Sequence, residues 1–163
     1  MPGKCIAIGD NCCDVYINLN RFYPTGNAVD FAVNLKRLGG EAELLTAFGN
    51  DSFALSVREL LDRKGIAHSR CHELPHPSAE AIMNLVNGDR VHVRYIRNVL
   101  ENFQPTDDDI AYAREFDIVY SERQSKVFRY ANRLKHDENI MVHDFTFRLQ
   151  DRSGAGHQAL VNA

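Results

Sequence analysis

The segment KCIAIGDNCCDVYI, residues 4–17, decides how the rest of this chain is interpreted. Its apolar part, Cys5–Ile8, is short and continuous, as in a strand buried on both faces of a parallel sheet. Gly9 ends that strand, and two acidic residues, Asp10 and Asp14, follow within one short stretch. Open α/β sheets bind ligands beyond the carboxyl ends of their strands, so this turn is a candidate binding site.

Asp14 is the first candidate ligand-binding residue. If the chain alternates beyond the turn, Asp14 and Tyr16 lie on one side and Val15 and Ile17 on the other. A carboxylate on the polar side can accept hydrogen bonds from ligand hydroxyl groups. An aspartate that serves only the turn, or caps a helix, is an equally good interpretation.

A second candidate site lies in the segment PTGNAVD, residues 24–30. Gly26 permits close backbone approach, and Asn27 begins a helix whose first N–H groups can meet a polar ligand. A capped helix without a ligand is the simpler interpretation of this segment taken alone.

Strand and helix patterns alternate along the chain. Continuous apolar runs predict further strands at Leu44–Phe48, Ile118–Tyr120 and Ile140–Val142. Helical periodicity and capping residues predict helices at Asn27–Leu38, from Asp51 or Ser52 to Lys64, at Thr106–Arg114 and at Gln124–Lys135. This alternation predicts one α/β domain with helices on both faces of a largely parallel sheet.

The segment 79–96 interrupts this series with an antiparallel hairpin around Asn87-Gly88, the dipeptide most typical of a type I′ turn. Regular pairing across a two-residue turn predicts that Arg90, His92 and Arg94 share a face with Ala81, Met83 and Leu85. Tyr95 would share the other face with Ile82. Arg90, His92, Arg94 and Tyr95 either contact a ligand or solvate a projecting flap.

Composition narrows the function classes. With 44% hydrophobic and 25% charged residues and a net charge of −3, the chain has no basic field for nucleic acid. No apolar run approaches the roughly 20 residues that span a bilayer, so we expect a cytoplasmic protein without membrane contact. The seven histidines lack metal-ligand spacing, and G-x-G-x-x-G is absent, so neither a metal site nor a dinucleotide site is expected. The four cysteines are expected to be reduced, with Cys5 and Cys13 in the core.

The succession of these motifs resembles the PfkB, or ribokinase, family of carbohydrate kinases. That family begins with a strand, a Gly-Asp-x-x-x-Asp-like turn, and a Gly-Gly-Asn segment that opens a helix ending in Leu-Gly. The corresponding segments here are Gly9–Asp14, Thr25–Ala28 and Leu38-Gly39, followed by matches at Thr46–Phe53, Leu60–Ile66, the hairpin and Asp144–Arg148. Within the family, residues 9–14 and 143–146 look closest to the fructoselysine 6-kinases.

The resemblance implies a ribokinase-like three-layer α/β/α fold with a largely parallel sheet and a small β-hairpin lid at about 79–96. Residues 1–163 would form the N-terminal portion of such a domain. The implied reaction is ATP-dependent phosphorylation of a sugar or aminosugar hydroxyl, with a fructoselysine-like substrate favoured. The implied partners are the sugar and a second copy that forms a homodimer through the lid.

The resemblance also implies a set of sugar-binding residues. They are Asp14, Gly26, Asn27, Asp30, Arg94, Tyr95 and Glu122. Glu122 follows a predicted strand where family members place a sugar contact, although a surface glutamate is the commoner explanation. Thr25 departs from the family because a β-branched residue stands where the first glycine is usual.

The family's Gly-Ala-Gly-Asp motif, which supplies the catalytic base and anion hole, is expected beyond Ala163, together with the ATP and Mg²⁺ sites. We therefore assign no catalytic residue and expect a truncated chain that is inactive alone. The segment SGAGH, residues 153–157, is expected to be a coincidence, in a loop entering a terminal helix, because histidine stands where the base belongs. The alternative function is a non-catalytic sugar-binding or dimerisation module.

Overall fold

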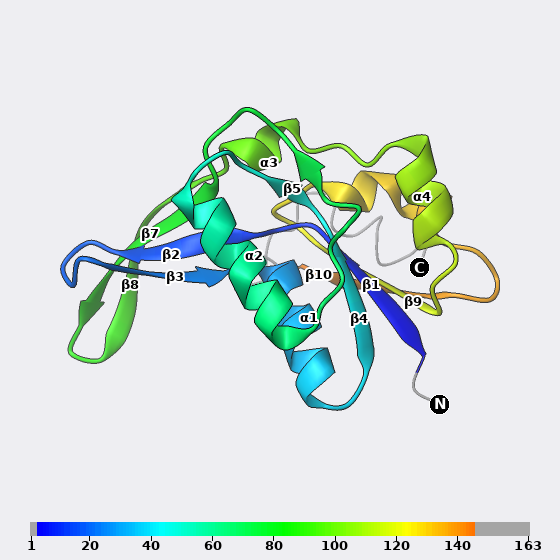
Figure 1. Ribbon diagram of the computed structural model, residues 1–163, viewed down its shortest axis with the longest axis horizontal. Coiled ribbons are helices and arrows are strands. Elements are labelled where there is room, and N and C mark those ends of the chain that lie inside the picture. Colours follow the sequence, from blue (N-terminus) through cyan, green and yellow to red (C-terminus); the bar gives the residue numbers. More distant parts are fainter. Residues whose placement is uncertain (1–2, 146–163) are drawn as a thin grey trace.

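A parallel sheet with the strand order β10-β9-β1-β4 forms the centre of the fold (Figure 1). The computed structural model describes residues 3–145 of the chain. Strand β1 (Lys4–Ile8) lies between β4 (Glu41–Leu45) and β9 (Ile118–Glu122), and β10 (Ile140–Asp144) pairs with β9. All three pairings are parallel, so the carboxyl ends of the four strands meet at one edge.

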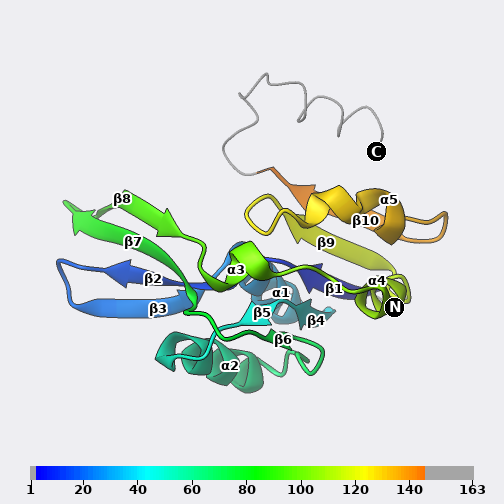
Figure 2. The same ribbon diagram turned by 90° about the horizontal axis from the view of Figure 1, so that it is seen from above.

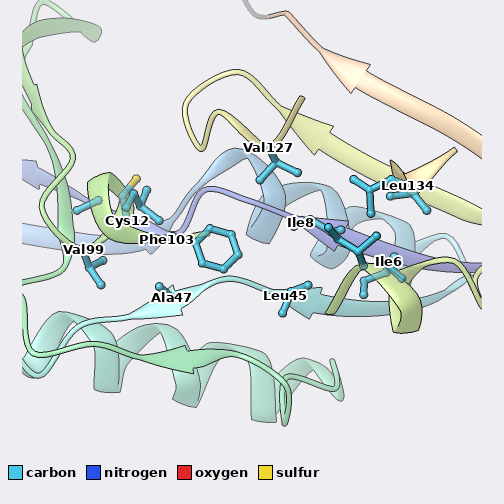
Figure 3. Packing of buried hydrophobic residues seen from close by; sticks show 14 of the residues in the cluster. Ile6, Ile8, Cys12, Leu45, Ala47, Val99, Phe103, Val127 and Leu134 are labelled. Atoms are coloured by element: carbon cyan, nitrogen blue, oxygen red, sulfur yellow. The ribbon is translucent and has the colours of Figure 1, made fainter. Parts of the chain in front are cut away.

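Helices cover both faces of this sheet because β1 is apolar on both sides. Cys5 and Ala7 pack in one core with α1 (Asn27–Arg37) and α2 (Ser52–Lys64). Ile6 and Ile8 face the other core, shown in Figure 3. That second core contains α3 (Val99–Asn102), α4 (Asp107–Ala113), the 3₁₀ helix η1 (Val127–Tyr130) and α5 (Ala131–Leu134). The predicted three-layer α/β fold is therefore confirmed.

A second sheet, with the order β3-β2-β7-β8, extends to one side of the first (Figure 2). It contains β2 (Cys12–Tyr16), β3 (Arg21–Thr25), β7 (Ala79–Val86) and β8 (Asp89–Ile96), and we call it the lid sheet. The φ angles of Asn87 and Gly88 are 51° and 87°, as the predicted I′ turn requires. The predicted hairpin thus exists, but β2 and β3 complete it, which the sequence analysis did not anticipate. The short strands β5 (Ala47–Phe48) and β6 (His72–Glu73) pair separately.

A β-bulge corrects the predicted faces of the hairpin. His92 pairs with Met83, but the register then shifts, so that Arg94 pairs with Ile82 and Tyr95 with Ala81. The extra residue reverses the orientation of every later side chain on β8. The predicted faces of Arg94 and Tyr95 were therefore wrong. Tyr95 lies on the face that also carries Asp14 and Ala81, here called the inner face, and Arg94 lies on the outer face.

Three predicted helices are confirmed together with their ends. Asp51 caps α2, Gly65 ends it with φ 63°, and Thr106 forms a capping box at the start of α4. The predicted continuous helix Gln124–Lys135 was wrong, because a turn precedes η1 and α5. The Glu122 carboxylate accepts the backbone N–H groups of Gln124 and Ser125, which fixes that turn.

The predicted strand Leu44–Phe48 is divided at Thr46. The Thr46 hydroxyl donates to the carbonyl oxygen of Gly9 at 2.5 Å and accepts from the Asn11 amide at 2.6 Å. The side chain therefore ties the end of β4 to the turn after β1.

Other predictions concern cysteines and the end of the chain. None of the four cysteines is paired, and Cys5 and Cys13 are fully buried, as predicted. Residues 146–148 of the last family motif and the SGAGH segment lie outside the described residues. Within residues 3–145, no helix is long and apolar enough to cross a membrane.

Asp51 joins helix α2 to the base of the lid sheet. Its Oδ1 atom accepts from the Ala54 N–H at 3.0 Å and the Ser78 hydroxyl at 2.7 Å, and its Oδ2 atom accepts from the Ser78 N–H at 2.7 Å. Burial alone would raise the pKa of Asp51, but these hydrogen bonds outweigh it and hold the pKa below its usual value. The ionised carboxylate therefore stabilises the entry to β7.

Replacing this carboxylate tests its contribution. Asp51→Ala should lower the free energy of unfolding by about 2–3 kcal/mol at neutral pH, because a helix cap and the Ser78 contacts are both lost. Since the folded-state pKa is lowered, the stabilisation is complete above the unfolded-state pKa and is lost as the pH falls through the folded-state pKa. Urea denaturation should therefore show that the difference in unfolding free energy between wild type and Asp51→Ala decreases as the pH is lowered. The matched control is Asp137→Ala at an exposed turn residue, and equal effects of the two changes would contradict the assignment.

Candidate functional site

The site is built on a buried carboxylate at the end of β9. Glu122 is completely buried, and its Oε1 atom accepts the N–H groups of Asp10 at 3.0 Å and Ser125 at 2.9 Å, while Oε2 accepts from Gln124. Burial raises the pKa of Glu122, and these donors oppose the rise. A Cβ atom on Gly9 would lie 2.4 Å from Oε1, so only glycine fits there. The ends of β1 and β9 are thereby held together.

Asp10 is the centre of the arrangement, and 3% of it is exposed. Its Oδ1 atom accepts from the Tyr95 hydroxyl at 2.5 Å, and its Oδ2 atom faces the Asn27 N–H at 3.4 Å. Burial, followed by the nearby charge of Glu122, raises the pKa of Asp10 to about 7, although Tyr95, Asn27 and Arg97 oppose the rise. Three elements meet at this carboxyl group: the turn after β1, the start of α1 and strand β8.

Gly26 brings the start of α1 against that turn. Its φ is 129°, and a Cβ atom here would lie 2.5 Å from the carbonyl oxygen of Asp10. As the N-cap residue, glycine has no side chain to cap the helix. The N–H groups of the first turn are therefore available to other acceptors, such as Asp10 or a polar ligand.

Asp14 and Asp30 add two further carboxylates. Asp14 lies on the inner face of the lid sheet, 3.6 Å from the Nη1 atom of Arg90. Burial raises the pKa of Asp14, and the positive charge of Arg90 opposes the rise. Asp30 is exposed on α1 and accepts the Thr25 hydroxyl at 2.7 Å, so the residue that departs from the family pattern orients this carboxylate.

The pairing of β2 with β3 brings these acids together, because Cys12 lies opposite Thr25, whose hydroxyl donates to Asp30. Asp14 follows on the same face of β2, while Asn27 and Tyr95 both meet Asp10. The structure therefore gathers most of the predicted binding residues where the turn after β1, the start of α1 and the lid sheet meet. They are Asp14, Gly26, Asn27, Asp30 and Tyr95.

Two predicted residues do not present their side chains with this group. Arg94 is on the outer face of the lid sheet, opposite the inner face that carries Asp14. Glu122 is buried and accepts the backbone N–H of Asp10. The alternative interpretation of Glu122 as a surface residue was therefore wrong.

Sequence reasoning missed Asp10 as a site residue, although its position after the central strand was a usable signal. It also missed Arg97, which follows β8, lies close enough to lower the pKa of Asp10 and pairs with Glu101 at 2.8 Å.

The chemistry of this group suits hydroxyl ligands. Carboxylates accept hydrogen bonds from sugar hydroxyls, whereas several of them together repel the phosphates of a nucleotide. Within residues 3–145, no three His, Cys, Asp or Glu side chains are arranged to hold a metal ion.

Comparison with known proteins identifies the family. The model described as pfkB family carbohydrate kinase matches residues 11–159. Fructoselysine 6-kinase of Escherichia coli (strain K12) is 33% identical over 115 residues, which cover 71% of this chain and 44% of that protein. Fructosamine kinase FrlD of Bacillus subtilis (strain 168) is 30% identical over 130 residues, covering 76% of this chain and 45% of the relative. The chain thus spans less than half the length of these relatives.

Solved structures show the same fold. Arabidopsis thaliana ribokinase, complexed with ribose and ATP, superposes with a TM-score of 0.78 at 16% identity, covering 89% of this chain and 54% of the ribokinase. Halothermothrix orenii fructokinase gives a TM-score of 0.78 at 14% identity, covering 98% of this chain and 66% of the fructokinase. The fold is therefore ribokinase-like, and with the family match over residues 11–159 it establishes that the chain belongs to the pfkB family of carbohydrate kinases.

Proposed function

We propose that this chain supplies the sugar-binding part of a kinase that transfers a phosphoryl group from ATP to a hydroxyl of a sugar or aminosugar. The observation that carries the proposal is the Asp14 carboxylate on the inner face of the lid sheet, in the strand whose Cys12 pairs with Thr25 and so brings it to Asp30 and the start of α1. A fructoselysine-like substrate is favoured because two relatives bear the names fructoselysine 6-kinase and fructosamine kinase.

Each group has a defined part in sugar binding. Asp14 and Asp30 accept hydrogen bonds from sugar hydroxyls, and the first N–H groups of α1 donate to hydroxyl oxygens. Arg90 releases Asp14 when a hydroxyl takes its place. The lid sheet covers the sugar and excludes water from the hydroxyl that reacts.

In this proposal ATP supplies the phosphoryl group, and the chain spans less than half the length of the relatives it matches. We therefore propose that ATP, Mg²⁺ and the catalytic base are held by the parts of the relatives that this chain does not match. A cytoplasmic location stays a prediction, with which the four unpaired cysteines agree.

Asp14→Asn should weaken fructoselysine binding by about tenfold, since an amide replaces one carboxylate acceptor. The raised pKa of Asp14 makes it protonate at a higher pH than an ordinary aspartate, so wild-type affinity should fall early on acidification. Asp14→Asn should lack that part of the pH dependence. Isothermal titration calorimetry between about pH 4 and pH 8 measures both effects.

The control for this experiment is Asp89→Asn, because Asp89 is exposed beside the hairpin turn and lies on the outer face. Asp89→Asn should bind as wild type does. Equal affinities of the wild type and Asp14→Asn across the pH range would rule out Asp14 as a sugar ligand.

The division of labour between sugar binding and transfer can be tested by turnover. In a coupled assay with ATP, Mg²⁺ and fructoselysine, the 163-residue chain should bind the sugar without producing ADP, while any longer product of the same gene should turn over. Turnover by the 163-residue chain would contradict the division. Sugar binding without turnover in either product would favour the alternative, a non-catalytic sugar-binding module.

The outer face of the lid sheet fits a second copy of the chain. Five apolar side chains on or beside this face are each at least 42% exposed: Ile17, Phe22, Val86, Val91 and Val93. Several exposed apolar side chains on one face of a sheet are typical of an interaction site, and the inner face carries the proposed sugar residues. We therefore include in the proposal a homodimer formed through the lid sheet.

Val91→Lys should convert the dimer to a monomer, because a charge in the centre of an apolar interface remains unpaired. Size-exclusion chromatography with light scattering measures the mass directly. Leu38→Lys, at an 85% exposed residue after α1, is the matched control and should stay dimeric. A monomeric wild type would refute the dimer.

A further inference from the structure

We infer that Asp10 is a positioning residue that couples the lid sheet to the start of helix α1. One of its carboxyl oxygens holds Tyr95 of β8, and the other faces the backbone N–H of Asn27. The inference rests on the proposed function only in treating these two elements as walls of the sugar site. It goes beyond that function because it assigns a mechanical link between them.

The link is geometrically direct. Tyr95 is 85 residues away from Asp10 in sequence and Asn27 is 17 away, yet both meet the same carboxyl group. The backbone of Asp10 is held on two sides, because its N–H donates to the buried Glu122 and its carbonyl oxygen packs against Gly26. We expect a displacement of Tyr95 to act on the start of α1 through the carboxyl group between them.

The β-bulge in β8 has a specific consequence here. Regular pairing would turn Tyr95 to the outer face of the lid sheet, where it cannot reach Asp10. The register shift beside Met83 returns it to the inner face. Bulges commonly change the direction of a side chain next to a functional site. The bulge in β8 therefore accounts for the contact between Tyr95 and Asp10.

The charges around Asp10 give the link a measurable signature. It is faced by Glu122 from β9, Arg97 from the segment after β8, Tyr95 from β8 and the Cys12 thiol from β2. The Tyr95 hydrogen bond lowers the pKa of Asp10, which burial and Glu122 raise to about 7. Removing the Tyr95 hydroxyl should therefore raise the pKa of Asp10. The chemical shift of the Asn27 N–H should follow this change, because that N–H faces the same carboxyl group.

The experiment follows the Asn27 amide resonance of the 163-residue chain by NMR as a function of pH, without any sugar. In wild type this amide should titrate with a midpoint well above the usual pKa of an aspartate. Tyr95→Phe, which keeps the ring and removes the hydroxyl, should move the midpoint to a higher pH. It should also speed hydrogen exchange at the start of α1 about fivefold, the effect of losing one hydrogen bond. Tyr23→Phe, on β3 of the same lid sheet, should change neither value.

Each outcome decides the inference. An Asn27 midpoint that Tyr95→Phe leaves unchanged would overturn the coupling. Asp10→Asn should abolish the titration at Asn27, and its persistence would assign the proton to Glu122 and overturn the role of Asp10. If Asp10→Asn does not fold, the comparison of Tyr95→Phe with Tyr23→Phe still decides. The NMR experiment contains no sugar, so its result does not depend on sugar binding. If the calorimetry shows no sugar binding, the proposed function is refuted but the coupling through Asp10 is not.

Discussion

The buried carboxylate of Glu122 is the constraint on which the site depends. A charge removed from water costs several kcal/mol unless it is compensated, and three backbone N–H groups supply that compensation here. Two of them belong to the turn that follows β9, and the third belongs to Asp10. The same carboxylate makes glycine obligatory at position 9. The ends of two neighbouring strands, and the carboxyl group of Asp10, are thus placed by one buried side chain.

The lid sheet is joined to the body of the domain by a pair of adjacent residues. Cys12 and Cys13 point to opposite sides of β2, and each enters a different hydrophobic core. The core beneath the inner face includes both Ile6 of the central sheet and Met83 of the lid sheet. The base of the lid sheet is therefore packed as firmly as the central strands, whereas the far end of the hairpin is exposed.

Membership of the pfkB family explains the acidic character of this site. Acceptors such as Asp14 suit a ligand rich in hydroxyl groups, and the free start of α1 supplies donors for the oxygens of the same ligand.

The sequence by itself determined the features that depend on neighbouring residues: most of the strand and helix order, the Asn87-Gly88 turn, and the start of a helix after Gly26. Periodicity and backbone preference decide these locally. It misled in the turn after Glu122, where the side chain takes two backbone N–H groups, and in the bulge that reverses Tyr95. Tertiary structure alone decided that Asp10 would meet a tyrosine 85 residues away, because register and burial depend on contacts that no local pattern encodes.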